Sequence, residues 1–277
     1  MIERRTFTSL GGECEIFGIR VAPAVMAEGE AWVRRLHDRL TRFNPWSELS
    51  KFNDSAFMPL RPAPPVFGSW VAVSAELEAL LREALRAYDV SGGLVHAGVL
   101  PALRAAGYTR DFDQGPTPPT AAPPAPAPLP ELLEVRIGHA RLRKGAAIDL
   151  GGVAKGWMAD RLAEHLGTNV LVNLGGDLYA RGGGGSGEGW PVGFGGKTVL
   201  LQDRGAATSG ITKRHWADAH HLIDPRTAVP AKTDLHEVSV LATSAADAEI
   251  YAKVAMILGS ADAPSWLEGR AAGWALS

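Results

Sequence analysis

A lysine follows a pair of glycines at the start of an expected helix, near the middle of the 277-residue chain. Residues 146–150 form an apolar run that predicts a strand, and residues 153–166 show helical spacing. Gly151 and Gly152 allow a tight turn, and Lys155 adds positive charge to the unpaired N–H groups of the first helical turn. This arrangement favours a bound pyrophosphate. An ordinary strand, turn and helix with Lys155 in solvent is the alternative, because short glycine motifs are common.

A histidine close to an acid is the second chemical feature. His221 precedes Asp224 by three residues, and the sequence Asp-Pro-Arg-Thr continues to Thr227. A nearby acid fixes the tautomer of a histidine and supports its charged form, so His221 is suited to act as a general base. The same four residues are also a common turn sequence. Ser209 precedes them, but the Gly-x-Ser-x-Gly turn of a serine hydrolase does not occur in the sequence.

Five motifs follow one another along the chain: Ser47–Asn53, Asp149–Asp160, Asn173–Asp177, Ala207–Gly210 and His221–Thr227. Together they resemble the ApbE family of FAD:protein FMN transferases, over roughly residues 5–260. The resemblance implies an α+β fold with a mixed sheet core and flanking helices, as one domain over residues 1–277. It also implies transfer of FMN from FAD to a threonine or serine hydroxyl of an acceptor protein, with release of AMP.

The resemblance gives each motif a role. His221, oriented by Asp224, is the expected base, and Lys155 would stabilise charge on the pyrophosphate. His96 lies where the family usually has an Asp-Pro-Thr triplet, and a histidine in an apolar loop is often structural. Ser47 and Glu48 also read as a helix cap and its first-turn acid. The residues expected to contact FAD are Ser47, Glu48, His96, Asp149, Gly151, Gly152, Lys155, Asp160, Gly175, Gly176, Asp177, Thr208, Ser209, Gly210, His221, Thr227 and Lys253.

Two positions on an expected helix depart from the family. In the family, an Asp and a Thr four residues apart hold a magnesium ion together with a backbone carbonyl. The matching residues here are Glu249 and Lys253, with the carbonyl from Ala154. A Glu–Lys pair at this spacing is commonly an exposed ion pair. The alternative is that the Lys253 ammonium takes the place of the ion, because a protonated lysine cannot bind a metal. These departures leave open a flavin carrier, an FAD hydrolase or another repurposed enzyme.

The elements that position these motifs follow from hydrophobic periodicity. Residues 5–20 predict a strand or hairpin, and residues 113–130 are rich in proline and alanine, which predicts a surface loop. The expected helices span 21–40, 74–88 and 244–259, and the expected strands span 133–137, 140–144, 169–174 and 190–194.

Composition excludes several classes of protein. A net charge of −2 and a pI near 6.5 give no basic surface for nucleic acid or an anionic membrane. Cys14 is the only cysteine, so an internal disulfide is excluded and a buried thiol is expected. No run of about 18 apolar residues occurs, and the first residues have no apolar signal region. We therefore expect a cytoplasmic protein.

Overall fold

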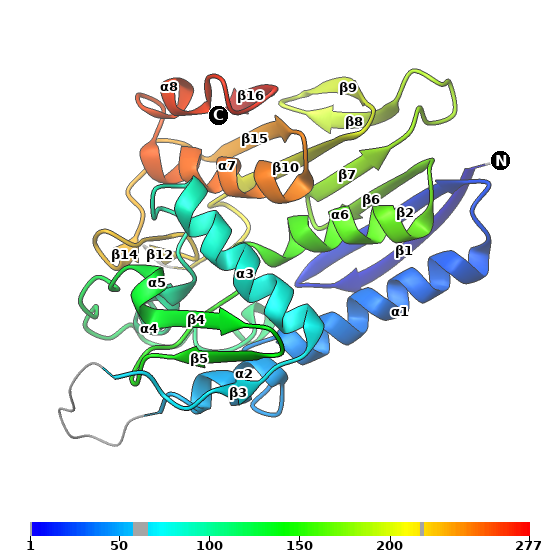
Figure 1. The fold of residues 1–277 in the computed structure, drawn as a ribbon. Coiled ribbons are helices and arrows are strands. Elements are labelled where there is room, and N and C mark those ends of the chain that lie inside the picture. Colours follow the sequence, from blue (N-terminus) through cyan, green and yellow to red (C-terminus); the bar gives the residue numbers. More distant parts are fainter. Residues whose placement is uncertain (1, 58–65, 217–218) are drawn as a thin grey trace. The chain divides into compact units, whose positions relative to one another are not determined.

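A computed structural model describes residues 2–57, 66–216 and 219–277. The chain divides into two compact units, each assembled from segments distant in sequence (Figure 1). Unit 1 consists of Met1–His37, Val153–Lys213 and Lys232–Ser277, and unit 2 of Asp38–Gly152 and Arg214–Ala231. The single domain over residues 1–277 stays a prediction.

A seven-stranded sheet is the centre of unit 1. Its order is β1 (Ile2–Ser9), β2 (Gly12–Ile19), β6 (Val170–Leu174), β7 (Asp177–Arg181), β10 (Arg204–Gly210), β15 (Glu237–Ala242) and β16 (Gly273–Leu276). The expected α+β fold, with helices flanking a sheet, is confirmed. The strand directions are more uniform than the mixed sheet that we expected, because each neighbouring pair runs antiparallel. Two-residue turns that reverse the chain account for part of this pattern.

One of these turns carries the predicted glycine pair. Gly175 and Gly176 connect β6 to β7 with φ angles of 68° and 100°. Positive φ at both central positions of a two-residue hairpin defines a type I′ turn, in which glycine has no steric cost. Leu174 pairs with Asp177 across the turn. The turn therefore fixes Asp177 as the first residue of β7.

Two helices cover one face of this sheet (Figure 1). Helix α6 (Ala154–Leu166) packs on β6 and β7, and α7 (Ala245–Leu258) packs on β10 and β15. The hairpin of β8 (Trp190–Phe194) and β9 (Lys197–Leu201) packs against Leu178 and other apolar side chains of the sheet. Because side chains alternate along a strand, Asp177 points to the opposite face from Leu178, toward α6. Unit 1 also contains most of α1 (Pro23–Leu40) and the short α8 (Ala263–Leu267).

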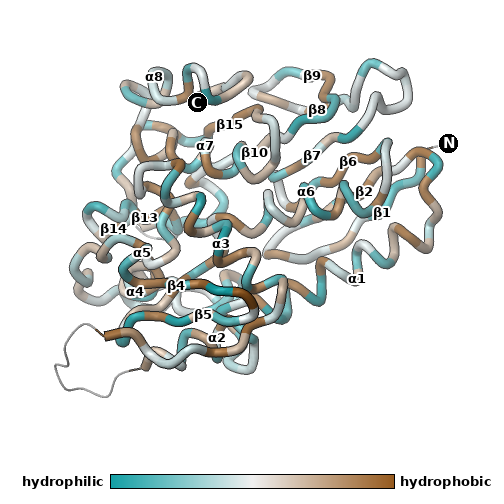
Figure 2. The backbone as a smooth tube through the Cα atoms, in the orientation of Figure 1, coloured by the Kyte–Doolittle hydropathy of each residue, from teal (hydrophilic) through white to brown (hydrophobic). Residues whose placement is uncertain are grey.

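Unit 2 combines short helices with a three-stranded sheet of order β3 (Val71–Ala72), β5 (His139–Leu142) and β4 (Leu133–Arg136). Helix α3 (Ala75–Val90) begins after the N-cap Ser74, as predicted, and buries Leu77, Leu80 and Leu81. Hydrophobic and hydrophilic colours alternate along its tube in Figure 2, as the amphipathic pattern requires. The other elements are α2 (Glu48–Asp54), η1 (Ala97–Val99), α4 (Leu100–Ala105), η2 (Phe112–Gln114), α5 (Leu129–Leu132), β11 (His215–Trp216), β12 (Ala219–His220), β13 (Ile223–Asp224) and β14 (Val229–Pro230).

The strand expected over residues 146–150 is wrong. This segment belongs to no strand, although Ile148 and Leu150 are buried. The side-chain amide of Asn53 accepts a hydrogen bond from the Ile148 N–H at 2.8 Å and donates one to the Ile148 carbonyl at 2.9 Å. A buried backbone needs partners for its polar groups, and a side chain can supply them as well as a strand. The apolar run therefore predicted the burial of this segment correctly, but it was wrong to predict that the segment pairs with a neighbouring strand.

The proline-rich segment is a loop, as expected. Residues 115–128 lie in neither helix nor strand, and most of them are exposed. The backbone N–H groups of Thr117 and Thr120 bond to carbonyls of Gly107 and Ala105 in the same unit. Across residues 2–57, 66–216 and 219–277, the helices are too short or too polar to cross a membrane. The cytoplasmic location stays a prediction.

Cys14 lies in β2 with no exposed surface, so the expected buried thiol is confirmed. Burial raises the pKa of the thiol from its ordinary 9.0 to about 11. The cause is that a thiolate would lose its hydration in this environment.

We predict that Cys14 destabilises the fold at alkaline pH. Between pH 9 and pH 11 the unfolded chain releases the thiol proton while the folded chain keeps it, so rising pH favours unfolding. Relative to Cys14→Ala, the free energy of unfolding should be about 1 kcal/mol lower at pH 10 than at pH 8. Urea denaturation of both proteins at both pH values measures this difference. An unchanged difference would contradict the raised pKa.

Candidate functional site

Four charged side chains of unit 1 form a cluster where α6 meets α7: Lys155, Asp177, Glu249 and Lys253. Lys155 Nζ lies 2.5 Å from Asp177 Oδ2, and Lys253 Nζ lies 2.9 Å from Glu249 Oε1. The carboxylate side chains are 2% and 0% exposed, and the lysine side chains 17% and 14%. A buried carboxylate is costly unless it has a charged or hydrogen-bonding partner. We call these four residues the α6–α7 charge cluster.

Both oxygens of Glu249 are engaged within this cluster. Oε1 contacts Lys253, and Oε2 accepts the backbone N–H of Gly156 at 2.8 Å. Burial raises the pKa of the Glu249 carboxyl, and the positive charges of Lys253 and Lys155 oppose that rise. The interpretation of Glu249 and Lys253 as an exposed ion pair is therefore wrong, because the Glu249 side chain is fully buried and that of Lys253 is mostly buried.

Gly156 is what lets α6 approach α7 so closely. A Cβ atom at this position would lie 2.4 Å from the carbonyl oxygen of Ala245, which is shorter than any real contact. The same closeness allows the Gly156 N–H to reach Glu249. The last glycine of the Gly-Gly-Val-Ala-Lys-Gly sequence, Gly156, thus allows α6 and α7 to pack in direct contact.

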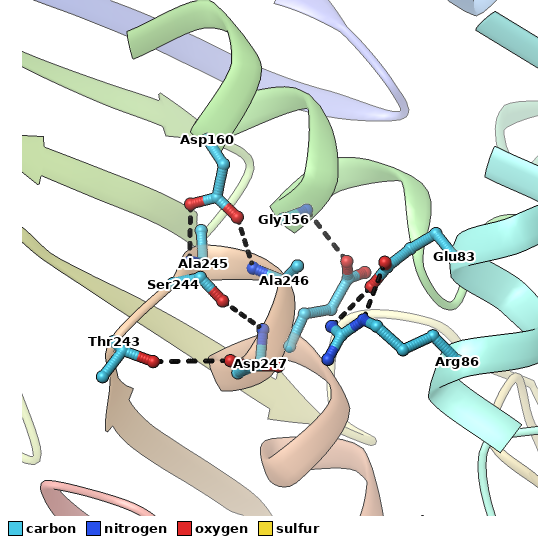
Figure 3. A network of polar contacts seen from close by, with 10 residues as sticks. Glu83, Arg86, Gly156, Asp160, Thr243, Ser244, Ala245, Ala246 and Asp247 are labelled. Carbon is cyan, nitrogen blue, oxygen red and sulfur yellow. Dashed lines mark hydrogen bonds and ion pairs between the residues drawn. The ribbon is translucent and has the colours of Figure 1, made fainter. Parts of the chain in front are cut away.

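Asp160 holds the first turn of α7, as Figure 3 shows. Its two carboxylate oxygens accept the backbone N–H groups of Ala245 at 2.7 Å and Ala246 at 3.0 Å. The hydroxyl of Ser244 accepts the N–H of Asp247 at 3.0 Å and is the N-cap of the same helix. A negative charge at a helix N-terminus satisfies unpaired donors and the helix dipole. The structure thus gives Asp160 a role in α7, and its contact with FAD stays a prediction.

The Thr208–Gly210 stretch lies on β10, next to the glycine turn of β6 and β7. The Thr208 N–H donates to the carbonyl of Gly176 at 3.1 Å, and the Thr208 hydroxyl lies 2.9 Å from that of Ser239. Thr208 is exposed and Ser209 is buried. The structure therefore brings the Asn173–Asp177 and Ala207–Gly210 motifs together within unit 1.

Asp149, in unit 2, is held by an arginine that the sequence reasoning did not select. Arg42 Nε lies 2.8 Å from one oxygen of Asp149, and the N–H of Gly151 donates to the other at 2.9 Å. The Arg42 side chain is 3% exposed, and its guanidinium lies over the rings of Phe43 and Tyr108. Arg42 Nη2 is buried, and within residues 2–57, 66–216 and 219–277 it has no hydrogen-bond partner. Buried donors are nearly always satisfied, so this atom suits an acceptor on a ligand.

Asn53 closes the Ser47–Asn53 motif, but the sequence reasoning gave its side chain no role. Its position next to Phe52 on a short helix was a usable signal, because a buried amide there must bond to something. Arg42 offered no such signal. Its partner Asp149 lies far away along the chain, and no local spacing connects the two.

The cap interpretation of Ser47 and Glu48 is confirmed. The Ser47 hydroxyl accepts the N–H of Ser50 at 3.0 Å at the start of α2. The Glu48 carboxylate accepts the N–H and the hydroxyl of Ser74 at 2.7 and 2.8 Å, and Arg39 lies 3.0 Å away. Glu48 therefore ties α2 to the N-terminus of α3. Contact of either residue with a flavin stays a prediction.

Both ring nitrogens of His96 are used inside unit 2. Nδ1 accepts the N–H of Gly98 at 3.0 Å, so Nε2 carries the proton and donates to the carbonyl of Ala127 at 3.1 Å. Burial lowers the pKa of His96 and so keeps the ring neutral. The ring also packs edge-on against Tyr88. These contacts support the structural interpretation of His96.

His221 and Asp224 have different partners in the structure. His221 Nδ1 lies 3.4 Å from the carbonyl of Arg214. The Asp224 carboxylate accepts Nε of Arg226 at 2.9 Å and Nη2 at 2.8 Å. Burial alone would raise the pKa of Asp224, but the hydrogen bonds and charge of Arg226 hold it below its ordinary value. The carboxylate that we expected to orient His221 is thus engaged by Arg226.

The turn after Asp224 is strained at one residue. The N–H groups of Thr227 and Ala228 both donate to the Asp224 carbonyl, at 3.2 and 2.8 Å. Ala228 has a φ of 57°, which costs a residue with a Cβ about 1–2 kcal/mol. Its methyl group packs with Leu103 and Ile223, which offsets part of that cost.

Residues 10–275 match the model of the ApbE family. The chain belongs to the ApbE family. A FAD:protein FMN transferase of Treponema pallidum is 32% identical over 230 residues, which are 68% of this chain and 61% of that protein. One of Haemophilus influenzae is 25% identical over 263 residues, which are 84% of this chain and 72% of that protein. This chain therefore spans about 61% of the length of the Treponema pallidum relative.

Solved ApbE structures share the fold. The flavin transferase ApbE of Vibrio cholerae superposes with a TM-score of 0.74 at 20% identity, covering 100% of this chain and 97% of that one. The apo flavinyl transferase ApbE of Pseudomonas stutzeri gives 0.79 at 20% identity, covering 100% and 95%. The ApbE-like fold that we expected is therefore confirmed.

The capping geometry predicts that Asp160→Ala destabilises the protein by about 2 kcal/mol, because two hydrogen bonds to a charged acceptor at a helix end are lost. Ser244→Ala removes one neutral cap of the same helix and should cost about 1 kcal/mol. Urea denaturation of both variants measures these losses. A smaller loss for Asp160→Ala than for Ser244→Ala would show that Asp160 does not hold α7.

Proposed function

We propose that this ApbE-family chain is a FAD:protein FMN transferase, which moves FMN from FAD to a threonine or serine hydroxyl of an acceptor protein. Family membership and the activity named for its relatives support the proposal. The observation that carries it is the α6–α7 charge cluster, where Lys155 stands in the first turn of α6, held by a buried carboxylate. A cation at a helix N-terminus suits a pyrophosphate.

Each unit, taken by itself, contains groups that fit a part of FAD. The N-cap residue of α6, Val153, makes no side-chain hydrogen bond to the helix, and two ammonium groups lie within the α6–α7 charge cluster. In unit 2, the buried Nη2 of Arg42 offers a donor to an acceptor atom of the ligand. Positive groups and N–H donors of this kind match the phosphates and carbonyl oxygens of a flavin dinucleotide.

The reaction needs a base and charge stabilisation. The acceptor hydroxyl oxygen forms a bond to the phosphorus on the FMN side of FAD, and the bond from that phosphorus to the AMP phosphate breaks. FMN then stays on the acceptor as a phosphoester, and AMP leaves. In this proposal His221 takes the hydroxyl proton, and Lys155 stabilises the negative charge that develops on the pyrophosphate. Asp224 contributes by holding Arg226 and the turn that follows it.

Magnesium does not fit the residues that match the family's metal site. Both oxygens of Glu249 are engaged, one by an ammonium and one by a backbone N–H. A protonated lysine has no lone pair to offer a metal, and octahedral Mg²⁺ prefers several oxygen ligands. In the described part of the chain, no group of three or more His, Cys, Asp or Glu side chains is arranged to hold a metal. We therefore assign no step of the reaction to a metal ion.

We predict that the purified protein, given FAD and an acceptor protein, releases AMP and adds the mass of FMN to the acceptor. The acceptor is one that the Vibrio cholerae transferase modifies in a parallel reaction, and both products are followed by LC-MS. His221→Ala should slow transfer by roughly 10²–10⁴-fold, the usual contribution of a general base. His165→Ala, which changes an exposed histidine on α6, is the matched control and should keep its rate.

Other products would identify the alternatives. AMP together with free FMN would indicate an FAD hydrolase. Bound FAD that stays intact, while the parallel reaction labels the same acceptor, would indicate a flavin carrier. Unchanged transfer by His221→Ala would remove His221 from the role of base.

A further inference from the structure

We propose that the ammonium of Lys253 takes the place of a divalent cation, so that this chain binds the pyrophosphate of FAD without a metal. The inference rests on the proposed function, because it takes FAD as the ligand. The sequence shows only that a lysine stands where the family has a metal ligand. The structure shows where its charge lies.

The position of the Lys253 ammonium is fixed by Glu249. The two residues are one helical turn apart on α7, and their charged atoms are 2.9 Å apart. Glu249 is in turn fixed by the Gly156 N–H of α6, at 2.8 Å. The ammonium is therefore held beside the first turn of α6, where a pyrophosphate is favoured. Glu249 acts here as a positioning residue.

The charges of the cluster already balance. Two carboxylates, Asp177 and Glu249, face two ammonium groups, Lys155 and Lys253. An ammonium carries three N–H donors, and Lys253 uses one of them on Glu249 at 2.9 Å. Its side chain remains 14% exposed, so the ammonium is not sealed from a ligand. A divalent cation at Glu249 would have to displace this lysine or lie beside a like charge, which is unfavourable.

A purely structural role for the ion pair is the competing explanation. A buried pair of this kind can stabilise the contact between α6 and α7 without touching a ligand. The two explanations differ in what they predict for FAD affinity and for metal binding. Stability alone does not separate them.

The first experiment measures FAD affinity from flavin fluorescence, in EDTA and in MgCl₂. For the wild type we expect the same Kd within twofold under both conditions. Lys253→Met, which keeps the length of the side chain and removes its charge, should weaken binding in EDTA at least tenfold. Lys197→Met removes an exposed lysine of unit 1 and should stay within twofold of the wild type. Thermal unfolding of each variant shows that it is folded.

The second experiment restores the family's metal ligands with the double variant Glu249→Asp/Lys253→Thr. Mn²⁺ binding is followed by EPR on EDTA-treated, desalted protein, with and without FAD. The wild type should bind no Mn²⁺ in this cluster, and the double variant should bind one ion. FAD binding by the double variant should become sensitive to EDTA. Without a metal, the shortened carboxylate of this variant has lost its ammonium partner, so thermal unfolding with and without Mn²⁺ checks that the variant is folded.

Three results would overturn the inference: loss of wild-type FAD binding in EDTA, binding of Mn²⁺ by the wild type that Glu249→Gln abolishes, or unchanged FAD affinity in folded Lys253→Met. Failure of the proposed function gives different patterns. A flavin carrier or an FAD hydrolase would still bind FAD and is identified by the LC-MS products. If FAD is not the ligand at all, it would bind to none of the proteins under either condition, while Mn²⁺ binding would still show whether Lys253 holds the cation position.

Discussion

A carboxylate that is removed from water needs a positive charge and hydrogen-bond donors close to it. Glu249 is such a carboxylate, and it lies at the contact of α6 and α7. The demand is met by Lys253 on one side and by the Gly156 N–H on the other. The second bond exists only because Gly156 lacks a Cβ and the helices can touch. A similar closeness recurs below α7, where a Cβ on Gly205 of β10 would lie 2.2 Å from the backbone of Ala245. The buried charge of Glu249 thus depends on the close contact of α6 with α7, and α7 is also in close contact with β10 of the sheet.

Local sequence patterns predicted the long helices and several strands, but not β7, β10, β15 or β16 of the central sheet. The caps at Ser47, Ser74 and Ser244 and the positive-φ turn at Gly175 depend on residues within a few positions of one another, so the sequence shows them directly. The periodicity of the helices is local in the same sense. For this reason α3 and α7 begin close to the positions that the helical spacing predicted.

Contacts between distant segments could not be predicted in the same way. The segment at residues 146–150 resembles a buried strand, and nothing in its own sequence shows that Asn53 would bond to Ile148 in place of a strand. The Arg42–Asp149 contact is equally invisible to spacing. The sequence shows the four-residue spacing of Glu249 and Lys253, but it does not show that these side chains are buried. Burial is what distinguishes them from a common exposed ion pair and fixes the position of the Lys253 ammonium. Asp224 shows a further limit, because its neighbour Arg226 competes for the carboxylate that His221 was expected to share.

The amide pair between Asn53 and Ile148 also has a dynamic consequence. The Ile148 N–H has its acceptor on α2, so this hydrogen cannot exchange with solvent unless α2 moves away or the segment itself opens. Local opening of α2 and of the chain that precedes the Gly151–Gly152 turn is therefore coupled through one side chain. We therefore expect the two segments to open together, although they are far apart in sequence. A fluctuation of the short helix α2 would thus reach the chain that leads into the Gly151–Gly152 turn and α6.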